Sequence, residues 1–128
     1  MAQDPARRTG PALEAMHQFL RWAIPTVGKF PRDQKFLLGD RIQGIGLDAL
    51  ERLIAATYTR DRRALLDAAN LDIEKLRHLF RIAFDLRVID ARRHEHAQRQ
   101  LEEIGRMIGG WRKDALRRQE GAALAEAT

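Results

Sequence analysis

Apolar residues recur at intervals of three and four along most of this chain, which is the spacing of one face of an α-helix. The spacing is most regular in the last third of the chain, where one series keeps these steps throughout. The series consists of His94, Ala97, Leu101, Ile104, Ile108, Trp111 and Ala115. It predicts a helix whose apolar seam faces a helical core. A composition rich in Ala, Leu and Arg, with 6% aromatic residues, also favours helices over sheets.

Proline, glycine and capping residues divide the periodic region into four predicted helices. We expect these helices at about residues 13–27, 32–59, 62–88 and 91–118. Gly28 and Pro31 separate the first two helices. Asp61 and Asp90 stand where the N-caps of the third and fourth helices would lie.

The predicted fold class is all-α, an antiparallel up-down-up-down four-helix bundle, because the connections between the helices are only a few residues long. A length of 128 residues suits one such domain. We place the bundle at residues 13–118, with a flexible N-terminal arm at 1–12 and a flexible C-terminal tail at 119–128.

The second predicted helix is apolar on two opposite faces, and the third carries a similarly broad apolar arc. A helix that is apolar on two faces has to bury both of them. A bundle this small offers one core, so the second face predicts a homo-oligomer. The expected interface residues are Leu47, Leu50, Ile54, Tyr58, Leu79, Ile82 and Leu86. The alternative is a monomer whose N-terminal arm covers one of the strips.

Several classes of chemistry lack the residues that they need. The sequence contains no Cys and no Ser, so disulfides, thiolate metal sites and Ser or Cys nucleophiles are excluded. His94 and His96 are two residues apart, which places them about 200° apart on a helix and disfavours a shared metal ion. With no Gly-rich phosphate loop either, we expect no catalytic residues, no metal site and no cofactor.

The start of the chain is polar and lacks the apolar core of a signal peptide. No run of about 18 apolar residues occurs, so no membrane-spanning helix is expected. These two observations predict a cytoplasmic protein without a membrane partner.

Basic residues are the remaining functional signal. The net charge is +5 and 19 of the 23 basic residues are Arg, a side chain that binds phosphate bidentately and stacks on bases. Candidate nucleic-acid and partner contacts lie beside the apolar arc of the third helix and along the fourth. They are Arg77, Arg81, Arg99, Arg106, Arg112, Lys113 and Arg117. The alternatives are a genome that favours Arg codons and an ordinary solvated face, since Glu95–Arg99 and Glu102–Arg106 can pair on the fourth helix.

Three stretches resemble the accessory variability determinant (Avd) proteins of diversity-generating retroelements. The first runs from Phe30 to Ile42 (FPRDQKFLLGDRI), the second from Leu76 to Arg81 (LRHLFR) and the third from Glu103 to Trp111 (EIGRMIGGW). The likeness extends over nearly all of residues 13–118, and the third stretch is its most specific part. Avd proteins belong to a wider group of four-helix bundles that includes proteins encoded in ribosomal RNA intervening sequences.

The resemblance implies a barrel-shaped homopentamer without catalytic activity. It also implies binding to a reverse transcriptase and to RNA and DNA during mutagenic cDNA synthesis. Arg77 and Arg81 match a basic pair on the family's third helix, and Arg106 and Trp111 match its fourth-helix motif. The alternative function is that of the intervening-sequence relatives, a structural or interaction protein without a polymerase partner.

Overall fold

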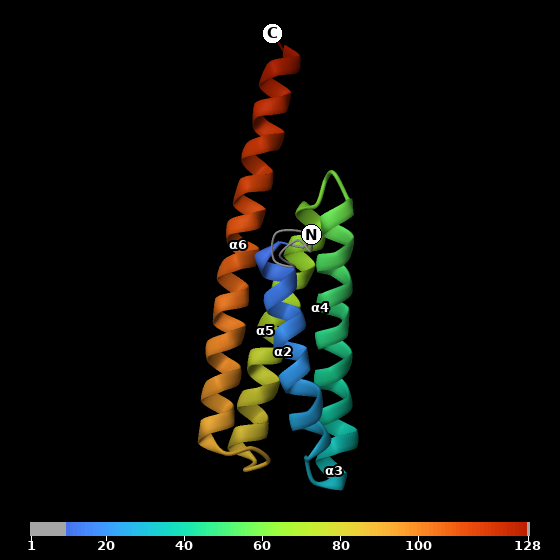
Figure 1. Ribbon diagram of the computed structural model, residues 1–128, viewed down its shortest axis with the longest axis vertical. Helices are drawn as coiled ribbons and strands as arrows, with labels where there is room; N and C mark the ends of the chain where they lie inside the picture. Colours follow the sequence, from blue (N-terminus) through green and yellow to red (C-terminus); the bar gives the residue numbers. More distant parts are fainter. Residues whose placement is uncertain (1–9, 128) are drawn as a thin grey trace, which may run out of the picture.

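The computed structural model describes residues 10–127, and every regular element within them is helical. The elements are α2 (Pro11–Gly28), α3 (Arg32–Gln34), the π-helical η1 (Lys35–Gly39), α4 (Asp40–Tyr58), α5 (Arg63–Asp85) and α6 (Ala91–Ala127). Because α3, η1 and α4 follow one another without a gap, they form a single helical rod. The four rods alternate in direction along the chain, as Figure 1 shows. The predicted four-helix bundle is confirmed.

The N-terminal boundaries agree with the sequence patterns in one case and differ in two. Asp90 is the N-cap of α6, since its Oδ1 accepts a 2.8 Å hydrogen bond from the backbone N–H of Arg93. The N-cap of α5 is Arg62, so the assignment of that role to Asp61 was wrong. Helix α2 begins at Pro11, inside the predicted N-terminal arm of residues 1–12. Residues 1–9 of that arm lie outside the described residues.

The fourth rod is longer than the sequence pattern indicated. Helix α6 continues to Ala127, so its expected end near Arg118 was wrong. Beyond that point its side chains are almost all exposed, and Figure 1 shows this part extending past the α4–α5 turn. Exposed helix-forming residues such as Ala122 and Ala123 give no apolar seam but have high intrinsic helix propensity, which explains the difference.

The core lies between the four rods, where α2 touches α4 and α6, and α5 touches the same two. Ala97, Leu101, Ile104 and Ile108 of the predicted α6 seam are fully buried. Across the diagonal, the rings of Phe19 and Phe80 meet edge to face at 5.9 Å. The largest fully buried side chains are those of Phe19, Phe80, Met16, Ile42, Leu53, Leu66, Ile73, Leu76, Leu101, Ile104, Ile108 and Val27. All four rods contribute to this one core.

Gly46 of α4 lies close against a core side chain of α2. A Cβ at Gly46 would lie 2.7 Å from Cδ2 of the buried Leu20, so a larger residue would require the Leu20 side chain to shift. Gly105 and Gly109 of α6 are not in such close contact. A Cβ at Gly105 would meet its neighbours at ordinary distances, and one at Gly109 would meet nothing within 4 Å.

Candidate nucleic-acid and partner interface

The outer strip of α6 carries four of the predicted basic residues, and two of them are paired on their own helix. Arg99 binds Glu95 at 2.9 Å, and Arg106 lies 3.4 Å from Glu103 and 3.8 Å from Glu102. Lys113 and Arg117 are exposed and have no ion-pair partner within residues 10–127. The strip is therefore a surface of mixed charge whose excess positive charge lies toward its C-terminal half.

The two arginines predicted as a basic pair on α5, Arg77 and Arg81, differ in their contacts: one is hydrogen-bonded and the other is unpaired. Nε of Arg77 donates to Oε1 of Gln98 on α6 at 3.3 Å, and Nε2 of Gln98 donates to the Arg77 carbonyl at 2.8 Å. Glu74 lies 3.7 Å from the same guanidinium. Arg81, one turn further on, is exposed and has no polar partner in the described part of the chain. Of the two, Arg81 is the one whose charge is available to a ligand.

Arg112 lies on the α5–α6 seam, where it forms an ion pair with Asp67 of α5. This contact joins the two helices and compensates the charge of the guanidinium. The neighbouring Trp111 is half-buried, and the guanidinium of Arg62 lies 5.5 Å from the centre of its ring. The fourth-helix motif thus fixes the turn between α4 and α5 against α6.

Three of the four predicted interface residues of α4 are exposed. We call Leu47, Leu50, Ile54 and Tyr58 the α4 strip. The exposed fractions of Leu47, Ile54 and Tyr58 are 43%, 42% and 86%, while Leu50 packs partly against the core. Arg52 of the same helix faces α5, and Ile54 lies about 200° around the helix from it. The α4 strip therefore faces away from α5.

The predicted interface residues of α5 lie on a different flank of the bundle. We call Leu79, Ile82 and Leu86 the α5 strip; Ile82 and Leu86 are 43% and 57% exposed, and Leu79 is half-buried. Asp72 marks the side of α5 that faces α4, and Arg77 marks the side that faces α6. At 100° per residue, the residues of the α5 strip lie closer to the direction of Asp72 than to that of Arg77. The strip is therefore on the side of α5 that is turned toward α4 and away from α6. The chain thus exposes two separate apolar strips, one on each flank of α4.

A comparison with known protein families gives a match over residues 12–115, to a family described as bAvd-like. The chain belongs to the bAvd-like family. The match spans the whole helical core and stops within α6. Avd-type proteins are accessory proteins without catalytic activity of their own. No curated protein matches the chain.

This bAvd-like chain contains a buried ion pair that the sequence patterns did not single out. Asp72 of α5 is 2% exposed and binds the guanidinium of Arg52 on α4, while Nζ of Lys75 lies 4.0 Å away. The hydrogen bond to Asp72 and the carboxylate charge raise the pKa of Arg52. One signal was present in the sequence, because Asp72 stands between Ala69 and Leu76 at the spacing of the apolar face.

Two of the four histidines of the bAvd-like chain contact aromatic rings. His94 stacks on Phe84 with 4.4 Å between ring centres, and His96 lies 4.5 Å from Trp22. Within residues 10–127, no three His, Asp or Glu side chains come together in a way that could hold a metal ion. In the same range, no helix combines the length and apolar character needed to cross a membrane.

Proposed function

We propose that this protein is a non-catalytic accessory subunit of a diversity-generating retroelement, which binds the reverse transcriptase, RNA and DNA during mutagenic cDNA synthesis. Membership of the bAvd-like family over residues 12–115 carries the proposal. The residues assigned to nucleic acid are the unpaired cations Arg81, Lys113 and Arg117, with Arg77 beside them. Arg99, Arg106 and Arg112 contribute less, because acidic neighbours already compensate them.

The two apolar strips support assembly into a ring. A two-fold dimer buries the same patch of both copies, whereas a contact between two different patches repeats around an axis and can close. The α4 strip and the α5 strip lie on different flanks, so one copy can place its α4 strip against the α5 strip of the next. The Avd resemblance sets the expected number of copies at five. Assembly would repeat Arg81 around the ring and strengthen the binding of an extended strand through avidity.

Co-purification with a reverse transcriptase encoded beside this gene tests the proposal. The full chain is expected to retain the enzyme, and Arg77→Ala/Arg81→Ala is expected to lose most of it. Arg21→Ala/Arg41→Ala removes two exposed arginines from other helices and serves as the charge-matched control.

Loss in both double variants would assign the effect to net charge alone. Retention in both would overturn the assignment to Arg77 and Arg81. A gene neighbourhood without a reverse transcriptase and a template/variable repeat pair would favour the intervening-sequence type of protein instead.

A further inference from the structure

The turn between α5 and α6 holds an arginine in a backbone conformation that favours glycine. Arg87 has a φ of 61°, the only positive φ among the described residues other than glycine. The N–H of Val88 donates to the carbonyl of Ala83 at 2.8 Å, and that of Arg87 to Phe84 at 2.9 Å. This pair of bonds defines a Schellman motif with Arg87 at the position where helices usually place glycine. The arginine is therefore strained where glycine would be relaxed.

The Schellman hydrogen bonds hold this backbone conformation, but no contact of the Arg87 side chain within residues 10–127 contributes to it. The Arg87 side chain is exposed and makes no hydrogen bond or ion pair there. Strained backbone positions are concentrated at functional sites. The guanidinium is consequently a candidate for contact with a ligand.

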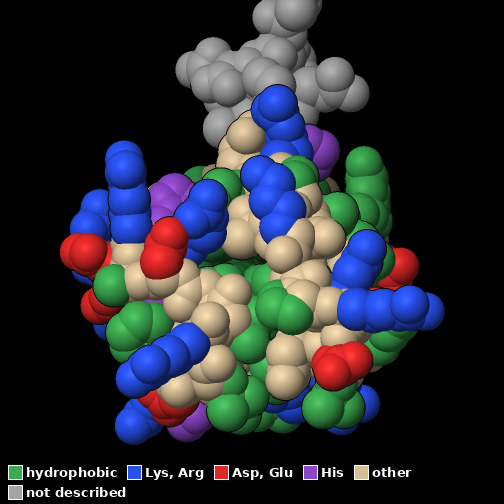
Figure 2. All heavy atoms as spheres, turned by 90° about the horizontal axis from the view of Figure 1, so that it is seen from below, with side chains coloured by type: hydrophobic (Ala, Val, Ile, Leu, Met, Phe, Trp, Pro, Cys, Tyr) green, Lys and Arg blue, Asp and Glu red, His purple; other side chains and the backbone are tan. Residues whose placement is uncertain are grey.

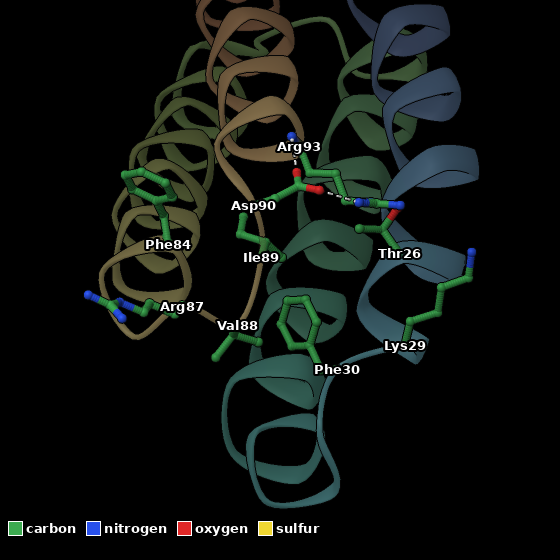
Figure 3. A pocket seen from close by; sticks show the side chains of 9 residues that line it. All are labelled: Thr26, Lys29, Phe30, Phe84, Arg87, Val88, Ile89, Asp90 and Arg93. Carbon is green, nitrogen blue, oxygen red and sulfur yellow. Dashed lines mark hydrogen bonds and ion pairs between the residues drawn. The ribbon is translucent and has the colours of Figure 1, made fainter.

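Arg87 stands beside a recess in the end of the bundle. The recess has a volume of about 560 Å³, within the range of small-ligand pockets. In Figure 3, Arg87 reaches outward on one side and Lys29 stands on the other, with Phe30, Val88 and Ile89 between them. Lys29, like Arg87, has no ion-pair partner in the described part of the chain. Two free cations thus flank an apolar floor.

The one carboxylate that lines the recess is already engaged. Asp90 accepts from the backbone N–H of Arg93 at 2.8 Å and from its guanidinium at 2.5 Å, as Figure 3 shows. The backbone bond and the nearby arginine charge hold the pKa of Asp90 below its usual range. The carboxylate is therefore not available to Lys29 or Arg87, and the recess keeps a positive excess.

A second hollow of about 320 Å³ adjoins the recess, with Asp90 and Arg93 lining both. Its other lining residues are Trp22, Arg92 and His96. Figure 2 looks onto this end of the bundle and shows Lys and Arg side chains around its rim, with fewer acidic ones. We call Lys29, Arg87, Arg92 and Arg93, around the α2–α3 and α5–α6 turns, the basic end.

We propose that the basic end binds single-stranded nucleic acid. Phosphates would lie at Lys29, Arg87 and Arg92, and an unstacked base would lie in the hollow beside Trp22. Cations alternating with an aromatic ring match a strand that alternates phosphates and bases, whereas an acidic peptide offers charge without flat rings. This site is separate from the Arg77/Arg81 surface and takes only its ligand class from the proposed function.

The test measures the anisotropy of fluorescein-labelled 12-nucleotide single-stranded RNA and DNA of mixed sequence, titrated with the full chain. Arg87→Gly relieves the strain and removes the charge. It is expected to raise Tm by about 3 °C and to weaken binding roughly fivefold at 0.1 M salt, with the log–log salt slope lower by about 0.7. Arg87→Gly/Lys29→Gln is expected to lose roughly 25-fold. Arg41→Gln, an exposed arginine on α4, removes the same charge elsewhere and should leave the slope unchanged.

Arg87→Gln keeps the left-handed backbone and separates charge from strain. It should weaken binding as Arg87→Gly does, without the rise in Tm. If both Arg87 variants bind like Arg41→Gln, the basic end is not a nucleic-acid site. If labelled 12-residue polyglutamate binds as tightly and loses as much affinity in the variants, the site is a general anion site and the assignment to nucleic acid is overturned.

The outcomes also separate this inference from the proposed function. Co-purification of the reverse transcriptase that depends on Arg77 and Arg81, together with oligonucleotide binding that ignores Arg87, removes this inference alone. Oligonucleotide binding that depends on Arg87, without capture of a reverse transcriptase, removes the proposed function alone.

Discussion

The buried ion pair between α4 and α5 allows a quantitative prediction about stability. Arg52→Met keeps most of the side-chain stem but leaves Asp72, 2% exposed, with only Lys75 at 4.0 Å. Breaking a fully buried pair costs about 3–5 kcal/mol, and a charge-assisted hydrogen bond contributes about 1.5–3 kcal/mol. Because the Arg52 side chain is 38% exposed, we expect a value in the lower range, about 2 kcal/mol of unfolding free energy. In a chain of this size that lowers Tm by about 8 °C.

The assay is urea unfolding followed by helical circular dichroism, at one protein concentration because assembly would shift the midpoint. Asp72 raises the pKa of Arg52, so the guanidinium keeps its charge throughout the neutral and mildly alkaline range. The loss in Arg52→Met should therefore be nearly constant between pH 6 and 9.

Two further variants make this prediction refutable. Arg41→Met, an exposed arginine on the same helix, should change the unfolding free energy by less than about 0.5 kcal/mol. Adding Asp72→Leu to Arg52→Met should recover most of the stability, since an apolar pair can replace a buried ion pair. A loss below about 0.5 kcal/mol in Arg52→Met, or no recovery in the double variant, would refute the reasoning.

Two other predictions concern assembly and pH. Ile54→Glu places a charge in the α4 strip at a position that is 42% exposed, so it should reduce the mass found by light scattering to that of one chain while the helical signal persists; a monomeric wild type would contradict the ring. The pKa of Asp90 is lowered in the folded chain, so its contribution to stability is complete above about pH 4 and disappears as pH falls through the lowered value. Asp90→Asn keeps a capping oxygen but cannot titrate, so its stability should fall less in acid than that of the wild type. Identical acid-unfolding curves for the two proteins would show that Asp90 does not cause the loss of stability in acid.

The helices and the core could be predicted from the sequence because burial and periodicity coincide on one face of each rod. Ala97, Leu101, Ile104 and Ile108 occupy the seam exactly as spaced in the chain, and Asp90 caps α6 through a local contact. Local patterns also indicated the exposed apolar residues of α4 and α5, because a second apolar face cannot share the core.

The contacts between helices could not be predicted in the same way. Arg52 and Asp72 are far apart in the sequence, and their pairing depends on how α4 and α5 are rotated against each other. The same holds for Arg77, which the sequence predicted as a nucleic-acid or partner contact and which Gln98 holds at the α5–α6 seam. The recess beside Arg87 is formed by two turns that only the folded chain brings together.

The π-helical segment η1 bears on how this bundle can tolerate changes in chain length. A π turn is equivalent to one residue inserted into an α-helix, which rotates everything before it by about 100° relative to everything after it. Phe36 and Leu37, inside η1, are exposed at 63% and 72%, while the following α4 keeps its core face. A related protein could therefore gain or lose a residue at this point, which would rotate that end of the molecule and leave the packing of α4 unchanged.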